Sequence, residues 1–194
     1  MKLNNFKGTK GFIIIIVLIA LILGYFYYLS NKDHATKDEA DVPTSPAQEL
    51  LLLRLDLDYP PTPKEVVKNY LEFTKVLHNE NLTDEEIDAL AIKIQELYDE
   101  ELVVSKSEED YLKDLKSELI TFRDNDYSIV NMYTSSSTDV EKFNLDGYEC
   151  AALYGTYNIR TSNGTKVLRE IFILRKDKEG HWKIYGFQPI AEEE

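Results

Sequence analysis

The sequence predicts an α+β protein: an N-terminal transmembrane helix, a tether, and then about three amphipathic helices packed on a curved antiparallel sheet of about four strands. Three observations predict this order. Residues 12–29 form an apolar run without a charge, apolar residues between Thr62 and Phe122 recur at helical spacing, and from Asp126 onward they alternate with polar ones. Helices that come first and hairpin-linked strands that follow are typical of the α+β class.

The apolar run at residues 12–29 is long enough to cross a membrane. At about 1.5 Å per residue it spans roughly 27 Å, close to the ~30 Å hydrocarbon core of a bilayer. Bulky tyrosines stand where a signal peptidase needs small residues, so we expect the helix to be retained. Residues 1–11 carry three lysines and no acidic residue. The positive-inside rule therefore predicts a single-pass protein of the cell membrane, with a cytoplasmic N-terminal flank and an extracytoplasmic C-terminal domain.

Residues 30–45 are predicted to be a flexible tether, because almost no large apolar side chain occurs there. The folded domain is predicted at residues 46–190, and residues 191–194 form an acidic tail. Ser45 and Pro46 are typical of a helix start, as N-cap and first helical residue. In the L-R-L-D-L-D-Y that follows, apolar residues alternate, so helix and strand compete there and we favour helix.

A capping sequence then recurs three times: T-P-K-E at 62–65, T-D-E-E at 83–86 and S-E-E-D at 107–110. In each, a hydroxyl residue that can cap a helix precedes an acidic residue by three positions. An apolar stripe at helical spacing follows every one of them. The sequence therefore predicts three amphipathic helices.

From Asp126 the period of the apolar residues changes to two. D-Y-S-I-V-N-M-Y predicts one strand, and residues 147–160 and 165–176 flank S-N-G, a hairpin signal. Residues 181–188 form the last predicted strand before Pro189. In a regular strand, Trp182 and Ile184 share one face, on which we expect Trp182 to close the core, and Phe187 lies on the other.

The composition excludes several classes of function. The net charge of −13 would repel nucleic acid, so no nucleic-acid partner is expected. The single cysteine, Cys150, forms no internal disulfide and is predicted to be a small buried side chain. The three histidines lack a second ligand at metal spacing, and no cofactor-binding fingerprint occurs. We therefore assign no metal, no cofactor and no catalytic residue.

The last predicted strand lies in K-D-K-E-G-H-W-K-I-Y-G-F, which resembles the final strand of NTF2-like, cystatin-like cone domains. The resemblance covers roughly residues 62–190. It implies a cone-shaped sheet around a pocket, in which related folds place an Asp, His or Tyr. Tyr70, Tyr154 and His181 are accordingly the candidate pocket residues. More narrowly, Y-P-P-T-P-K-E-V-V-K-N-Y with the N-terminal anchor resembles an uncharacterised family of single-span envelope proteins of Clostridia-like bacteria, which implies a location but no function.

The function predicted from the sequence is a non-catalytic binding or scaffolding role at the cell envelope. Its expected partners are the cell membrane, through residues 12–29, and an envelope protein or wall component. The alternative is a small-molecule-binding or enzymatic domain that uses a pocket inside the cone. An enclosed pocket with a desolvated ionisable pair would favour the alternative, and an exposed apolar patch or sheet edge would favour the scaffold.

Overall fold

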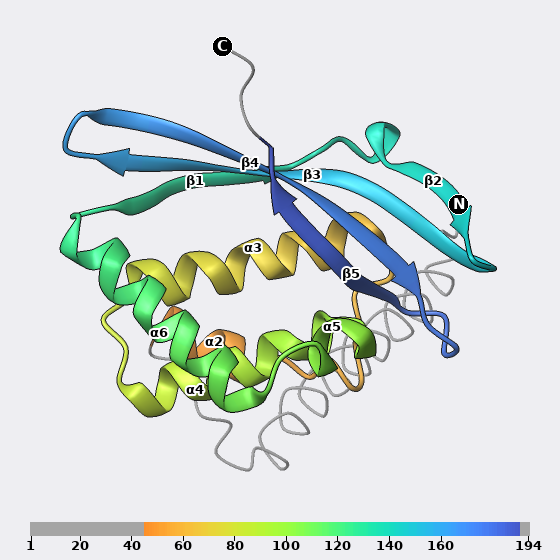
Figure 1. Cartoon of the computed structure of the whole chain (residues 1–194), viewed down its shortest axis with the longest axis horizontal. Coiled ribbons are helices and arrows are strands. Elements are labelled where there is room, and N and C mark those ends of the chain that lie inside the picture. Colours follow the sequence, from red (N-terminus) through yellow and green to blue (C-terminus); the bar gives the residue numbers. More distant parts are fainter. Residues whose placement is uncertain (1–44, 191–194) are drawn as a thin grey trace, which may run out of the picture. The chain divides into compact units, whose positions relative to one another are not determined.

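A computed structural model describes residues 45–190 of the chain (Figure 1). The predicted transmembrane helix at residues 12–29, the tether up to residue 44 and the acidic tail lie outside the described residues. The helices are α2 (Pro46–Leu51), α3 (Pro63–Asn79), α4 (Asp84–Ile94), α5 (Glu100–Val104) and α6 (Glu108–Asp124), with a short 3-10 turn η1 (Gln95–Leu97) after α4. The strands are β1 (Ser128–Thr134), β2 (Glu141–Leu145), β3 (Tyr148–Thr161), β4 (Gly164–Lys176) and β5 (Trp182–Pro189).

The predicted helix starts are confirmed by their caps. The side chains of Ser45, Thr62, Thr83 and Ser107 each accept a hydrogen bond from a backbone N–H of the first turn. At Thr83 the reciprocal bond also forms, because the Glu86 carboxylate accepts from the Thr83 backbone N–H at 2.9 Å. These caps satisfy donors that a helix start leaves without an intrahelical partner.

The fold class as predicted was wrong in its elements. Residues 45–190 form five α-helices and five strands, not about three and about four, and no helix among them is long and apolar enough to cross a membrane. The missed strand, β2, carries mostly exposed side chains and so lacks the alternation that marks a half-buried strand. The missed helix, α5, has five residues and buries none of them. The L-R-L-D-L-D-Y segment forms turns instead of a helix.

The five strands form one antiparallel sheet in the order β1-β3-β4-β5, and β2 also pairs with β3. The C-terminal half of β3 pairs with β1 and its N-terminal half with β2, so these two strands lie end to end beside β3. The hairpin predicted at S-N-G joins β3 and β4, which pair from Thr161 and Gly164 at the turn to Cys150 and Arg175. Strand β5 pairs only with the Glu170–Lys176 half of β4.

The helices lie against one face of the sheet, with α3 running across it and α4 and α6 farther out (Figure 1). No described helix covers the opposite face. The core between helices and sheet includes Phe73, Phe172, Leu71, Leu90, Leu97 and Leu153, all fully buried. Two predictions are confirmed here, since Trp182 is only 4% exposed and Cys150 only 2%.

A β-bulge in β5 changes which side chains face the helices. On β4, Leu174 pairs with Ile184, and the residue before it, Ile173, pairs with Gly186. Tyr185 is therefore the extra residue of the bulge. Beyond it Phe187 lies opposite the fully buried Phe172. The prediction that Phe187 lies on the face opposite to Ile184 was therefore wrong, because a bulge shifts the alternation by one residue.

Candidate functional site: a cavity between the helices and the sheet

A cavity of about 530 Å³ lies between the helical layer and the inner face of the sheet. Its walls come from α3, α4, α6, β1, β3, β4 and β5, and from the segments that join them. A hollow of similar size, about 550 Å³, lies on α6, but this one helix supplies its whole lining. We therefore take the cavity, which two layers of the fold enclose, as the candidate site.

Aromatic rings form much of the cavity wall. The Tyr70 ring on α3 lies 5.2 Å from that of Phe172 at an interplanar angle of 67°, and 5.3 Å from that of Phe187. Tyr98, which follows η1, lies 6.1 Å from Tyr70. These separations lie within the 4.5–7 Å range of favourable aromatic pairs. The β5 bulge thus supplies one ring of this wall, because it turns Phe187 toward the helices.

Three of the tyrosines, Tyr70, Tyr98 and Tyr111, have hydroxyl pKa values above the ordinary one, and burial is the largest cause in each case. These phenols therefore stay neutral at physiological pH. They offer the cavity polar groups that donate and accept hydrogen bonds, but no charge.

Glu170 on β4 is the acidic side chain deepest in this wall. Burial raises the pKa of its carboxyl to about 7, and the Glu118 carboxylate adds to the rise. His78 and the Tyr157 hydroxyl act in the opposite direction but do not offset the burial. Near neutral pH the carboxyl therefore exists in both the charged and the neutral form, which is typical of groups at functional sites.

Tyr157 on β3 presents a buried hydroxyl to the same cavity. The residue is 3% exposed, and its oxygen makes no hydrogen bond of good geometry with any described residue. It lies near enough to the Glu170 carboxyl to favour the charged form of that group. The hydroxyl interacts with the Glu170 carboxyl and with Thr74 but forms a well-aligned hydrogen bond with neither, so it gains less than an ordinary buried hydrogen bond would give.

His78 on α3 and Glu118 on α6 lie within hydrogen-bond distance at the cavity wall, and they form an ion pair when the imidazole is protonated. The His78 Nδ1 lies 2.7 Å from the Thr74 carbonyl oxygen, and its Nε2 lies 3.2 Å from Glu118 Oε1. Since carbonyl and carboxylate oxygens both accept, the doubly protonated imidazolium is the form that donates to both. The hydrogen bond from His78 lowers the pKa of the Glu118 carboxyl. Glu118 makes this contact from the solvent side, since its side chain is 66% exposed and that of His78 only 8%.

Lys106 and Asp114 form a second ion pair among the lining residues. The Lys106 ammonium donates to the Asp114 carboxylate and thereby lowers the pKa of that carboxyl. Both side chains are substantially exposed, at 46% and 62%. This pair therefore lies where the cavity meets solvent, while Glu170 and Tyr157 lie deeper.

Of the three residues predicted from the sequence, only Tyr70 lines the cavity. Tyr154 lies on β3 on the face away from the helices, 37% exposed, with the Arg169 guanidinium 5.2 Å from its ring. His181 lies in the turn before β5, where its ring is 4.5 Å from that of Tyr59. The structure thus does not bring Tyr154 and His181 into the site.

Sequence reasoning missed Glu170 and Tyr157, although one signal pointed to the first. Leu168, Phe172 and Leu174 alternate along β4 on the buried face, and Glu170 occupies the one remaining place in that series. An acidic residue within an apolar alternation is a polar group directed at the core. Within residues 45–190, no group of three or more His, Cys, Asp or Glu side chains could hold a metal ion.

Helices that cover one face of a five-stranded antiparallel sheet, with a cavity between the two layers, define an α+β domain with an internal pocket. The chain belongs to the family described as "Domain of unknown function (DUF6715)", whose match extends over residues 1–187. A search of curated proteins found no significant match to the sequence. The predicted resemblance to NTF2-like domains stays a prediction, and the family description assigns no ligand.

Proposed function

We propose that the domain binds a small amphipathic molecule in the cavity between the helices and the sheet. One observation carries this proposal: a cavity of about 530 Å³ combines an aromatic and aliphatic wall with the buried pair Glu170 and Tyr157. Ligand pockets are typically 300–1,000 Å³ in volume, mostly apolar, and carry a few polar groups that orient the ligand.

Folding alone does not account for the polar pair. A carboxyl that loses water on burial and a hydroxyl without a well-aligned hydrogen bond each destabilise the folded state. An apolar residue of similar volume at either position would remove that cost. A ligand that bonds to both groups would improve on the weak contact that they make with each other, which gives a reason for their presence.

One observation supports a second function, proton transfer to or from the bound molecule. A carboxyl with a pKa of about 7 is suited to act as an acid or a base near neutral pH, and the Tyr157 hydroxyl beside it is a further proton carrier. Turnover of a bound molecule that is lost in Glu170→Asp, which keeps the carboxyl but moves it, would distinguish this function from binding alone.

The scaffolding role at the cell envelope stays a prediction. The membrane-proximal location on which that role depends concerns residues outside 45–190. The sheet face away from the helices carries exposed aromatic residues such as Tyr133 and Tyr154, 52% and 37% exposed. The Arg169 guanidinium lies over the Tyr154 ring, and single exposed aromatics are ordinary on protein surfaces.

Binding of a neutral fluorescent dye such as Nile red tests the proposed function. We expect saturable binding by the purified chain, weakened several-fold by Leu168→Trp, because this side chain lines the cavity and the larger ring fills part of it. The matched control is Val167→Trp, the adjacent residue on the outer face of β4, 48% exposed, which should bind as the unaltered chain does. Absence of saturable binding, or equal loss in both variants, would contradict the proposal.

A further inference from the structure

The charges around the cavity do not balance when Glu170 is ionised. Among the lining residues, Glu118 is paired with His78 and Asp114 with Lys106. No basic side chain among the described residues forms an ion pair with Glu170. When His78 is protonated, the ionised cavity wall therefore carries one negative charge without a counter-charge, on a carboxyl that is partly buried. A ligand with a positive charge would supply that counter-charge.

Seven aromatic side chains line the cavity. The seven are Tyr70, Tyr98, Tyr111, Phe122, Tyr127, Tyr157 and Phe187. The face of an aromatic ring carries partial negative charge and attracts an ammonium group, by about 0.5–2 kcal/mol per contact depending on desolvation. Rings and carboxylate therefore favour the same kind of ligand.

We propose that the ligand of the cavity is an organic cation, an amine or quaternary ammonium with an apolar body, whose charge lies against Glu170 and the aromatic rings. This proposal rests on the proposed function and names the chemical class of the molecule bound. The Tyr157 hydroxyl, buried beside Glu170, orients the carboxylate or accepts from an N–H of the ligand. The aliphatic wall formed by Leu115, Ile129, Ile159 and Leu168 receives the apolar body.

The affinity for a cation must then increase with pH. A cation stabilises the ionised carboxylate, whereas at pH values below about 7 burial holds Glu170 protonated. Binding below that pH has to release the proton, so affinity rises as pH rises through about 7. The titratable groups that face Glu170 are Tyr157 from β3, His78 from α3 and Glu118 from α6. Because His78 and Glu118 also face this carboxyl, a variant of Glu170 is needed to isolate its own contribution.

Benzyltrimethylammonium and its uncharged isostere neopentylbenzene provide the test. The two probes have nearly the same shape, and neither titrates, so a difference between them reports the charge. With the purified chain at pH 8, we expect the ammonium to bind at least about tenfold more tightly than the isostere in competition with Nile red. Between pH 8 and pH 5.5 its affinity should fall about tenfold, while that of the isostere stays constant.

Glu170→Gln should remove the preference for the charged probe and most of the pH dependence, while binding of the isostere persists. Glu141→Gln, an exposed acid on β2, is the matched control and should change neither. Equal or tighter binding of the isostere by the unaltered chain would overturn the proposal even if Glu170→Gln failed to fold. Loss of all three binding signals, dye included, would instead overturn the proposed function itself.

Discussion

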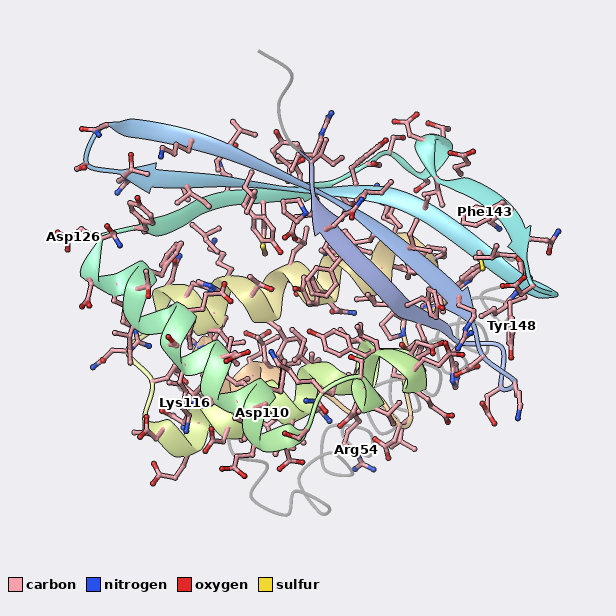
Figure 2. All side chains as sticks on the ribbon, viewed as in Figure 1. Arg54, Asp110, Lys116, Asp126, Phe143 and Tyr148 are labelled. Carbon is pink, nitrogen blue, oxygen red and sulfur yellow. The ribbon has the colours of Figure 1, made fainter. Side chains whose placement is uncertain are left out.

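The guanidinium of Arg175 on β4 makes two hydrogen bonds to the carboxylate of Asp99, from Nε to Oδ2 at 2.9 Å and from Nη2 to Oδ1 at 2.6 Å. Asp99 also caps α5, since its side chain accepts from the Glu101 N–H, and its own N–H donates to the Ile184 carbonyl oxygen. The bond to Asp99 is the largest cause that raises the pKa of Arg175. The Tyr148 ring, which Figure 2 labels at the start of β3, lies 4.4 Å from the same guanidinium. One ion pair thus joins the helical layer to three strands.

Asp99→Asn should destabilise the fold by about 3 kcal/mol, because it removes the buried carboxylate that pairs with Arg175 and leaves that guanidinium only the exposed Glu101 as an acidic partner. Urea unfolding measures the change. Arg54 and Asp56 offer a matched control, since they make the same two-bond contact, both at 2.9 Å, on the surface. The side chains of that pair are 65% and 59% exposed, so Asp56→Asn should leave the unfolding midpoint unchanged. Equal losses in the two variants would show that burial does not decide the effect.

Trp182→Ala should cost about 3–5 kcal/mol of unfolding free energy, because the indole is only 4% exposed and its removal leaves a cavity in the core. The expected result is a lower midpoint in urea with an unchanged slope. Tyr133→Ala, 52% exposed on β1, is the control for loss of an aromatic residue from a strand and should change the midpoint little. A Trp182→Ala chain as stable as the unaltered one would refute the structural role of this residue.

Gly155→Ala should destabilise the domain by about 1–3 kcal/mol through overpacking. A Cβ added there would lie 2.7 Å from Cε2 of the fully buried Phe172 and 3.2 Å from Cδ2 of Leu71. Gly186→Ala is the comparison, because a Cβ at that position meets nothing within 4 Å. Thermal unfolding should separate the two variants by several degrees. An unchanged melting temperature in Gly155→Ala would contradict this prediction. It would mean that the Phe172 ring can move aside more easily than a close-packed core allows.

Glu170→Gln should stabilise the unliganded chain in a way that depends on pH. The folded-state pKa of about 7 lies above the ordinary value of 4.5, so the folded state binds this proton more tightly than the unfolded state. The contribution of Glu170 to stability therefore falls as pH rises from about 4.5 to 7 and is level above that range. At pH 8 the unfolding free energy of the variant should exceed that of the unaltered chain by about 2 kcal/mol. This is less than the full pKa shift would give, because the carboxyl is only partly buried.

Urea unfolding at pH 5 and pH 8 checks this dependence. The gap between Glu170→Gln and the unaltered chain should be small at pH 5 and should widen by pH 8. The exposed acid Glu141, changed to Gln, provides the control, for which no such widening is expected. A gap that stayed constant between the two pH values would mean that the Glu170 carboxyl is solvated in the folded chain.

Much of the fold could be predicted because it depends on local signals. A hydroxyl cap acts within one turn of helix, so Thr62, Thr83 and Ser107 mark their helices without reference to the rest of the chain. Strand β2 could not be found this way. It is held by pairing with β3 rather than by a buried face of its own, and such pairing leaves no period in the sequence.

The site was predicted less well, because the register between strands determines which side chains face the cavity. Tyr70 was found, since it lies on the apolar stripe of α3. Phe187 was placed on the wrong face, because a bulge depends on how two strands meet and not on the residues of one. Tyr154 and Tyr157 lie on opposite faces of β3, and only Tyr157 lines the cavity. The residue type alone does not show which tyrosine faces the cavity.

Strand β5 pairs with only part of β4, so part of the backbone edge of β4 has no neighbouring strand. The backbone edge of β4 at Thr165–Leu168 lies beyond the end of β5, and an open edge of this kind is a template for strand addition and aggregation. Lys166 lies on this edge, so an antiparallel copy docking there would bring like charges together. On β5 itself the bulge at Tyr185 and the proline at 189 interrupt the regular ladder. These features disfavour the addition of a further strand along the β4 and β5 edge of the sheet.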